Sequence, residues 1–443
     1  MSTAKLNVLM VAEQCNPEWA SVPLVAYNFY KEISQIVNVT LVTHSRNREG
    51  FEQHGYHSKI TYIDESDFAK RYYQFIVKLI GEGNWPLYLA LSYPIFAEFN
   101  RSVYRLFADE VKQGQYDLVH SITPMMPRYP VSLIRACQKT PLLLGPVNGG
   151  VPFPPGFRET AKKEKTFWNV LKPFGRYLVP GYIETYKKAD RILSGSTYTL
   201  NMLKQLFGIE DDRIELFFEN GITEDFLKAS KPTKGAGKVE LLFVGRLVPY
   251  KGADLVIEAL GEFEPALRNK LALTIVGDGS ERQALENRVC ELNLQNIVTF
   301  TGWVKQYQTQ TYYSQSDIFC FPSVREFGGA VVMEAMACGL PCIVVNNGGI
   351  AEYVTEGTGF KIEPTSRSYV IQELAKHIRL LVENDALRQQ MADQAIARAQ
   401  EFEWSQKAKH IVEIYTELVR QKNAQTHPTV VVATNDATGG LPV

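Results

Sequence analysis

Short apolar runs alternate with segments of helical period along nearly the whole of this 443-residue chain. The runs predict strands at 6–12, 38–43, 117–122, 142–146 and 191–194, and again at 239–244, 271–276, 297–301, 318–321 and 342–345. In the first half, helices are expected near 23–35, 66–80, 95–113, 126–138 and 158–188. Such alternation is typical of parallel sheets covered by the helices that connect their strands. The sequence therefore predicts an α/β fold.

The two series of strands are separated by a polar stretch, 228–238, which is rich in Gly, Pro and Lys and has the composition of a linker. We expect two doubly wound Rossmann-like domains that face each other across a cleft, because ligands of open α/β sheets bind at the carboxyl ends of the strands. The predicted units are an N-terminal domain (1–222), the linker (223–238), a C-terminal domain (239–403), a helix (404–422) and a disordered tail (423–443).

Composition excludes several classes of protein. The formal net charge is −1, which gives no electrostatic basis for binding nucleic acid. The six cysteines form no C-x-x-C pair, so reduced core thiols are expected. The amino terminus is too short and polar for a signal peptide before the first strand, and the uncharged stretch 83–97 contains two prolines and is too short to cross a bilayer. We therefore expect a cytoplasmic protein.

The most informative segment is 323–341, where a strand is followed by a loop that carries Glu326 and by Gly328-Gly329 at the start of a helix. Glycines let backbone amides approach a ligand closely, and a helix amino terminus offers unpaired N–H groups. Glu334 lies further along the same helix, so the two carboxylates could each accept hydrogen bonds from sugar hydroxyls. Taken alone, the pair is equally typical of an acid at a helix start and a solvated acid on a helix face.

A second strand-to-helix loop brackets two cations with glycines: Gly245 and Arg246 at its start, Lys251 and Gly252 at its end. Fixed positive charge at the carboxyl end of a strand stabilises a departing diphosphate without a metal ion. Two solvated loop cations would give the same pattern.

Together, these motifs resemble the retaining glycosyltransferases of family four (glycosyl transferases group 1), which have the GT-B fold. The similarity extends over 239–420 and includes 275–279, 299–303 and 347–352. It implies that Arg246 and Lys251 hold the donor diphosphate, that Glu326 contacts the donor sugar and that Glu334 binds the ribose hydroxyls. The remaining donor contacts that it implies are Gly245, Gly277, Gly302, Trp303, Phe327, Gly328 and Gly329.

The N-terminal half is expected to bind the acceptor. Asn16, Glu18 and Ser21 lie in a polar loop after the first strand, where family members usually have glycines, and a plain surface loop is the alternative. His120 ends another strand and is assigned to catalysis through a hydroxyl of the donor sugar, although a core histidine would give the same pattern. A further loop contributes three tentative acceptor contacts, namely Asn148, Gly149 and Gly150.

Two stretches mix basic and aromatic residues. Residues 157–191 contain nine Lys or Arg and four Asp or Glu, and residues 68–107 contain five Lys or Arg and two Asp or Glu. Such mixtures suit contact with an anionic membrane or a lipid-linked acceptor. An amphipathic helix whose stripe packs into the core is the alternative.

The sequence is thus interpreted as a metal-independent hexosyltransferase-type enzyme that uses a UDP- or GDP-sugar as substrate, with no cofactor and no metal site. The acceptor is expected to be a saccharide or a lipid-linked glycan, and peripheral contact with a membrane is expected. The chain contains no Asp-x-Asp pair, which fits charge neutralisation by Arg246 and Lys251. A nucleotide-sugar epimerase of the same fold and a non-catalytic sugar-binding scaffold are the alternatives.

Overall fold

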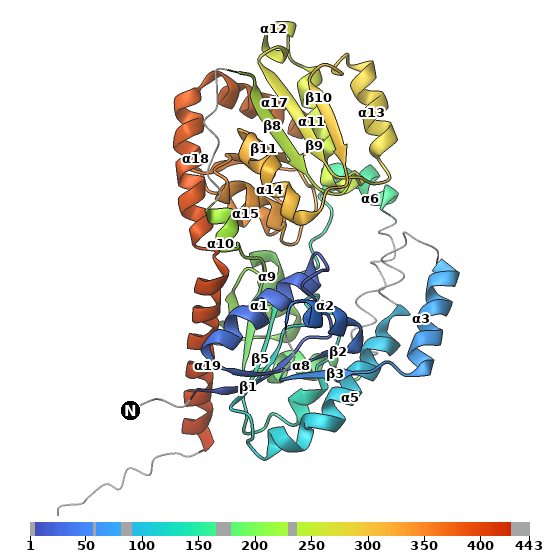
Figure 1. The fold of residues 1–443 in the computed structure, drawn as a ribbon, viewed down its shortest axis with the longest axis vertical. Helices are drawn as coiled ribbons and strands as arrows, with labels where there is room; N and C mark the ends of the chain where they lie inside the picture. Colours follow the sequence, from blue (N-terminus) through green and yellow to red (C-terminus); the bar gives the residue numbers. More distant parts are fainter. Residues whose placement is uncertain (1–4, 56–58, 81–90, 165–178, 229–236, 427–443) are drawn as a thin grey trace, which may run out of the picture.

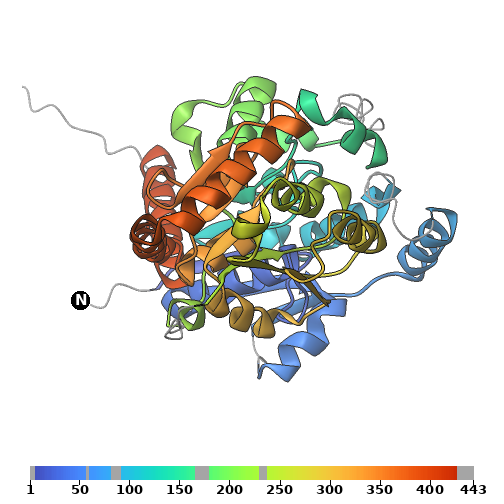
Figure 2. The ribbon, with the colours of Figure 1, turned by 90° about the horizontal axis from the view of Figure 1, so that it is seen from above.

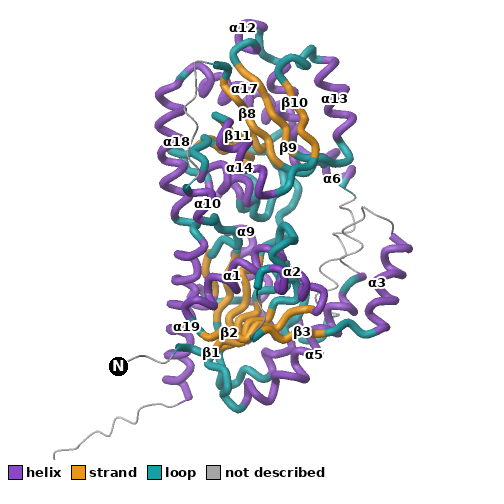
Figure 3. The backbone as a smooth tube through the Cα atoms, viewed as in Figure 1, coloured by secondary structure: helices purple, strands orange, loops and turns teal. Residues whose placement is uncertain are grey.

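The computed structural model describes residues 5–55, 59–80, 91–164, 179–228 and 237–426. Two parallel sheets lie one above the other along the long axis of the molecule, each surrounded by helices (Figures 1 and 3). The predicted α/β fold with two doubly wound domains is therefore confirmed.

The N-terminal sheet has the order β3-β2-β1-β4-β5-β6-β7, and all of its strands are parallel. Its strands are β1 (Asn7–Val11), β2 (Asn38–His44), β3 (Ile60–Ile63), β4 (Leu118–Ser121), β5 (Leu142–Val147), β6 (Arg191–Ser194) and β7 (Ile214–Leu216). The helices of this half of the chain are α1 (Val22–Ile36), α2 (Arg48–Gln53), α3 (Asp67–Ile80), α5 (Tyr93–Lys112), α6 (Arg158–Lys163), α8 (Tyr182–Lys188) and α9 (Thr197–Phe207). Of these, α6 lies beside the C-terminal sheet (Figure 1).

The C-terminal sheet has the order β10-β9-β8-β11-β12-β13 and is also parallel throughout. Its strands are β8 (Val239–Val244), β9 (Leu271–Val276), β10 (Val298–Gly302), β11 (Ile318–Phe321), β12 (Cys342–Val345) and β13 (Gly359–Ile362). The helices include α10 (Glu224–Leu227), α11 (Ala253–Gly261), α12 (Pro265–Arg268), α13 (Arg282–Glu291), α14 (Gln306–Gln315), α15 (Ala330–Ala337), α16 (Ile350–Tyr353), α17 (Arg367–Glu383) and α18 (Asp385–Gln400).

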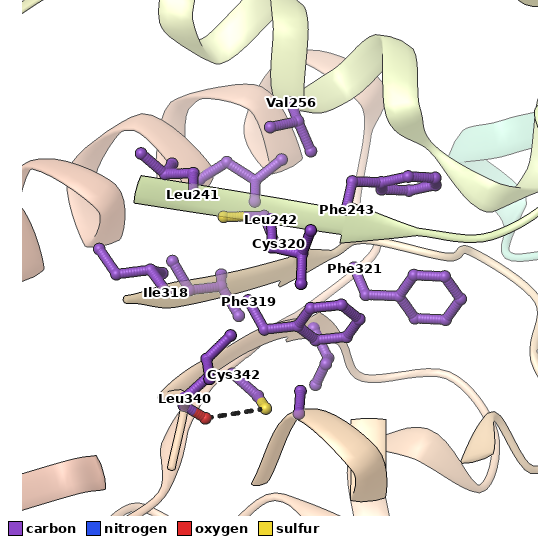
Figure 4. Packing of buried hydrophobic residues seen from close by; sticks show 14 of the residues in the cluster. Leu241, Leu242, Phe243, Val256, Ile318, Phe319, Cys320, Phe321, Leu340 and Cys342 are labelled. Carbon is purple, nitrogen blue, oxygen red and sulfur yellow. Dashed lines mark hydrogen bonds between the residues drawn. The ribbon is translucent and has the colours of Figure 1, made fainter. Parts of the chain in front are cut away.

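The core of the C-terminal domain is built on both faces of its two central strands. Figure 4 shows Leu241, Leu242 and Phe243 on β8 beside Ile318 and Phe319 on β11, and all of them are fully buried. Central strands that are covered on both faces read as continuous apolar runs. This explains why the sequence predicts these two strands with their correct bounds.

Several predicted elements differ from the structure. The helix expected at 126–138 is wrong, because only a 3-10 turn (Ser132–Arg135) forms there. Pro124, Pro127 and Pro130 remove backbone N–H donors and restrict the residues before them, which prevents a continuous helix. The short strands β3, β7 and β13 are not predicted by the sequence, since each has only three or four residues and little periodicity.

Two segments cross between the domains. Helix α19 (Trp404–Thr426) packs along α1, where Trp404 meets Phe29 edge-to-face with ring centroids 4.9 Å apart. The helix continues to Thr426, so the first residues of the predicted tail are helical, and 427–443 lie outside the described residues. In the other direction, Phe157 beside α6 is buried in the core of the C-terminal domain.

The sheet order locates the expected ligand sites. In each sheet the first three strands are added toward one edge, and the fourth strand pairs on the other side of the first. The order of the strands therefore reverses between β1 and β4 in the N-terminal sheet and between β8 and β11 in the C-terminal sheet. Ligands of such sheets bind at the carboxyl ends of the strands at this switch point. The loops that follow β4, β8 and β11 are therefore the places to look for chemistry.

Candidate functional site

The loop after β8 brings the predicted cations to the loop after β11. Lys251 Nζ forms an ion pair with Glu326, and both side chains are largely buried. Ser323 Oγ lies 3.3 Å from the same Glu326 carboxylate, and Arg246 donates a hydrogen bond of 2.8 Å to the hydroxyl of Tyr250. Two residues that are 75 positions apart in sequence are thus held in direct contact at the switch point.

The start of α15 presents unpaired backbone donors beside this ion pair. Gly329 is the residue before the first helical turn, and no side chain caps the helix. Within the described residues, the amides of Gly328 and Gly329 have no hydrogen-bond partner. Free N–H groups and the positive end of a helix dipole favour an anion or a polar oxygen at this point.

Three glycines line the carboxyl edge of the upper sheet. Gly245 and Gly277 directly follow β8 and β9, and Gly302 is the last residue of β10. Gly245 N donates to Val276 O at 2.9 Å, and Gly277 N donates to Gly302 O at 3.0 Å. At Gly277, with φ 134°, an added Cβ would lie 2.0 Å from the Gly245 carbonyl oxygen, so only glycine fits. Trp303 follows and is 70% exposed.

Glu334 lies within α15 and is almost fully buried. Its Oε2 accepts a hydrogen bond of 2.9 Å from the Tyr313 hydroxyl. This contact orients the carboxylate from the side of α14. The expected binding of ribose hydroxyls by Glu334 stays a prediction.

Asn148 does not face an open acceptor site. It is buried, and its Nδ2 donates to both carboxylate oxygens of Glu219 at 2.9 Å and to the carbonyl of Phe327 at 3.0 Å. Because Asn148 follows β5 and Phe327 follows β11, this amide connects the two domains. The tentative acceptor role of Asn148 is corrected to an interdomain contact.

The carboxylate of Glu219 is enclosed by backbone. Cβ atoms built on Gly195 and Gly328 would lie 2.1 and 2.0 Å from its two oxygens. Burial raises the pKa of Glu219 to about 7 and lowers the pKa of Lys407 to about 7, and the opposite charges of the two groups act against these shifts. Sequence reasoning missed this pair, because Lys407 lies on α19 and nothing local identifies it.

The other tentative acceptor residues occupy two loops. Gly149 and Gly150 follow Asn148 with positive φ values of 156° and 85°. Asn16 is buried, and its Oδ1 accepts from the Glu18 amide at 2.8 Å, so it shapes the loop and does not face outward. Glu18 and Ser21 are exposed.

His120 is a core residue and not a contact to the donor sugar. It is fully buried, its Nδ1 lies 2.6 Å from the Tyr415 hydroxyl, and its Nε2 lies 2.7 Å from the Gly145 carbonyl. With both ring nitrogens occupied, no atom is left for a substrate. Burial lowers its pKa to about 4, so the ring is neutral at physiological pH. The catalytic assignment of His120 is therefore corrected.

Three charged residues at this site were not predicted. Arg325 donates through Nε to the Val151 carbonyl at 2.8 Å. Glu164, just after α6, lies close enough to Arg246 and Arg325 for their charges to lower its pKa, although burial, the larger effect, raises it. Arg128 follows β4. Only Arg325 had a signal in the sequence, since it directly precedes Glu326.

Residues 226–398 match the family model described as glycosyl transferases group 1. The C-terminal domain is thus similar to the group 1 glycosyltransferases. Two curated relatives are D-inositol 3-phosphate glycosyltransferases. The one from Kineococcus radiotolerans is 27% identical over 281 residues, which cover 57% of this chain and 62% of that protein. The one from Streptosporangium roseum is 28% identical over 262 residues, which cover 55% of this chain and 58% of that protein. The chain thus spans about three fifths of the relatives' length.

Solved structures share the fold of the whole chain. The HepE protein of Anabaena in complex with UDP has a TM-score of 0.63 at 18% identity, with 93% of this chain and 100% of that chain covered. A sucrose-phosphate synthase from Thermosynechococcus elongatus has a TM-score of 0.61 at 18% identity, with 94% and 100% covered. These similarities confirm the GT-B fold around the group 1 domain.

Proposed function

We propose that this protein is a retaining glycosyltransferase that moves a sugar from a nucleotide diphosphate sugar to an acceptor hydroxyl. The observation that carries the proposal is the contact between Lys251 and Glu326 beside the unpaired amides of Gly328 and Gly329. Positive charge, a carboxylate and free N–H groups converge at the switch point of a group 1 domain. This combination suits a diphosphate that carries a sugar.

Each group has a separate task in the proposed reaction. Arg246, Lys251 and the start of α15 bind the diphosphate and stabilise the charge that develops as the bond to the sugar breaks. Because the protein itself supplies this positive charge, no metal ion is required for the purpose. In the described part of the chain, no three His, Cys, Asp or Glu side chains gather in an arrangement that could hold a metal ion.

The same groups support the retention that we propose. Glu326 is already engaged by Lys251 and Ser323, so we assign it to hydrogen bonds with the sugar and not to covalent attack. The acceptor hydroxyl then attacks on the face that the nucleotide leaves, and a phosphate oxygen of the departing nucleotide accepts its proton.

The comparisons supply the substrate classes that we propose. HepE structures contain UDP, UDP with glucose, and UDP-glucose, which favours a UDP-sugar donor here. The relatives named D-inositol 3-phosphate glycosyltransferases indicate that domains of this kind occur with small polar acceptors. We retain a saccharide or lipid-linked acceptor in the proposal.

A membrane surface is a further proposed partner. No helix in the described ranges has the length and apolar character needed to cross a bilayer. However, α3 stands out from the body in two perpendicular views (Figures 1 and 2). It exposes Phe68, Phe75 and Leu79 beside Lys70 and Lys78. Apolar side chains among lysines suit the surface of an anionic membrane. Of the other basic stretch, 157–191, residues 165–178 lie outside the described residues.

A screen of nucleotide sugars tests the function. The matching donor should raise the thermal midpoint, because a ligand that binds only the folded state stabilises it by mass action. Lys251→Ala should abolish this stabilisation, whereas Lys270→Ala, an exposed lysine of the same domain, should not. An epimerase would convert the sugar without any acceptor, and a scaffold would bind without turnover. Either result would contradict the proposal.

A further inference from the structure

The loop between β11 and α15 contributes two backbone amides to the donor site, those of Gly328 and Gly329. In the part of the chain that the structure describes, neither amide has a hydrogen-bond partner. Each amide shares a planar peptide unit with the carbonyl of the residue before it, Phe327 or Gly328. In a trans unit the N–H and the C=O point in opposite directions. Because glycine has no Cβ to restrict these units, contacts to the two carbonyls decide where the amides point.

Both carbonyls are held by buried asparagines of the N-terminal domain. Asn148 Nδ2 donates to the Phe327 carbonyl at 3.0 Å, and Asn220 Nδ2 donates to the Gly328 carbonyl. Asn148 follows β5 and Asn220 follows β7, whereas the loop follows β11 of the other sheet. The Phe327 carbonyl also accepts from the Gly349 amide at 3.0 Å. Side chains of one domain thus fix two peptide units of the other.

The amide group of Asn148 is held in one orientation. Ser196 Oγ and Thr199 Oγ1 each lie 2.9 Å from Asn148 Oδ1, and both carboxylate oxygens of Glu219 lie 2.9 Å from its Nδ2. An ionised carboxylate only accepts hydrogen bonds, so it requires the amide nitrogen on its side. The Nδ2 group is therefore directed to the Phe327 carbonyl by residues that do not belong to the loop.

The segment that carries Asn220 is also fixed. Lys407 on α19 donates to the carbonyl of Phe218 at 2.5 Å, and the ring of Phe218 meets that of Tyr353 edge-to-face with centroids 5.0 Å apart. Two residues beyond Asn220, the amide of Ile222 donates to the Phe402 carbonyl at 2.9 Å. The backbone around Asn220 is thus a fixed support for the loop.

The loop lies between these asparagines and the charged groups of the donor site. A Cβ built on Gly328 would lie 2.9 Å from Asn220 Nδ2. A Cβ built on Gly329 would instead lie 3.3 Å from Cγ of Glu326, which is paired with Lys251. The loop therefore contacts the supporting residues through one glycine and the ion pair through the next.

We propose that Asn148 and Asn220 are positioning residues, which aim the two amides of the loop at the phosphate that carries the donor sugar. This inference rests on the proposed function and deepens it. N–H groups that already point at a leaving group stabilise its developing charge, because they need not reorient during the reaction. The donor site is then complete only when the N-terminal domain is docked against the loop.

The test compares two probes, the nucleoside diphosphate and the nucleoside monophosphate of the base identified in the donor screen. Only the diphosphate contains the second phosphate, at which the amides are aimed. Affinities are measured by calorimetry for the wild type, Asn148→Ser and Asn220→Ser, because serine stays polar but is too short to reach the loop. Thr197→Ala is the matched control. Thr197 Oγ1 also forms a hydrogen bond between the domains, at 2.7 Å, but it does so with Glu352 on α16.

Each asparagine substitution should weaken diphosphate binding by about ten-fold. Monophosphate binding should change by less than about two-fold, which also shows that the variant is folded. The control should leave the ratio of the two affinities unchanged. A variant that loses both nucleotides equally, or neither, removes that asparagine from the inference, and this result for both overturns it.

The same selective loss in Thr197→Ala would also overturn the inference, since docking of the domains in general would then be the cause. A wild type that binds the diphosphate no more tightly than the monophosphate would instead contradict the donor site of the proposed function.

Discussion

Gly328→Ala is expected to damage the connection between the two domains. The new Cβ would lie 2.0 Å from Glu219 Oε1, and the carboxylate would have to retreat by more than about 1 Å to reach ordinary contact distance. It has no room to do so, because its other oxygen lies against Gly195 and Asn148 Nδ2 holds both oxygens.

The cost can be estimated from these contacts. Overpacking of a close-packed site costs about 1–3 kcal/mol, and weakening the hydrogen bonds from Asn148 to a carboxylate adds about 1.5–3 kcal/mol. Alanine also lowers the conformational entropy of the unfolded chain, which stabilises the folded protein by about 0.4–1 kcal/mol. We therefore expect the free energy of unfolding, measured by denaturant titration, to fall by about 2–5 kcal/mol. Gly329→Ala should cost less, since the closest neighbour of its new Cβ, the Cγ2 methyl of Ile350, lies 3.0 Å away and not 2.0 Å.

A second substitution distinguishes the proposed clash from a general loss of stability. Glu219→Asp shortens the side chain by one bond, about 1.5 Å, which matches the retreat that the new Cβ at position 328 would demand while keeping the charge. In the double-mutant cycle, Gly328→Ala with Glu219→Asp should be more stable than the sum of the single effects by about 1–3 kcal/mol. Additive effects within about 0.5 kcal/mol would refute the proposed clash.

Four further outcomes are expected. Glu326→Ala should cut sugar transfer by a hundred-fold or more, about 2.7 kcal/mol of transition-state stabilisation, while the unfolding curve is retained, and near wild-type turnover would contradict the sugar contact. Transfer should persist in EDTA, and loss that Mn²⁺ restores would show that Arg246 and Lys251 do not suffice. Because the folded pKa of His120 is about 4 and its ordinary value is 6.5, the unfolded chain binds more protons in that window. Stability should then fall by about 2 kcal/mol from pH 7 to pH 5, and His120→Gln should remove this part of the pH dependence. Replacing Phe75 and Leu79 with Ser should reduce co-sedimentation with anionic vesicles at low salt, and unchanged sedimentation would exclude α3 as the contact.

The sequence by itself determined the architecture and the positions of the loops that meet at the switch point of the C-terminal sheet. Buried central strands such as β8 and β11 appear as continuous apolar runs, so their positions can be read locally. The loops that carry Arg246, Lys251 and Glu326 follow these strands directly, and parallel topology brings such loops to one edge. The short edge strands β3, β7 and β13 were missed because their few residues carry too little pattern.

The tertiary structure alone decided what the N-terminal loops do. His120 and Asn148 end strands and look like substrate contacts, but their partners, Tyr415 and Phe327, come from residues 295 and 179 positions away. No local sequence pattern predicts such contacts. Whether a polar group faces a ligand or another residue depends on what the fold places opposite it.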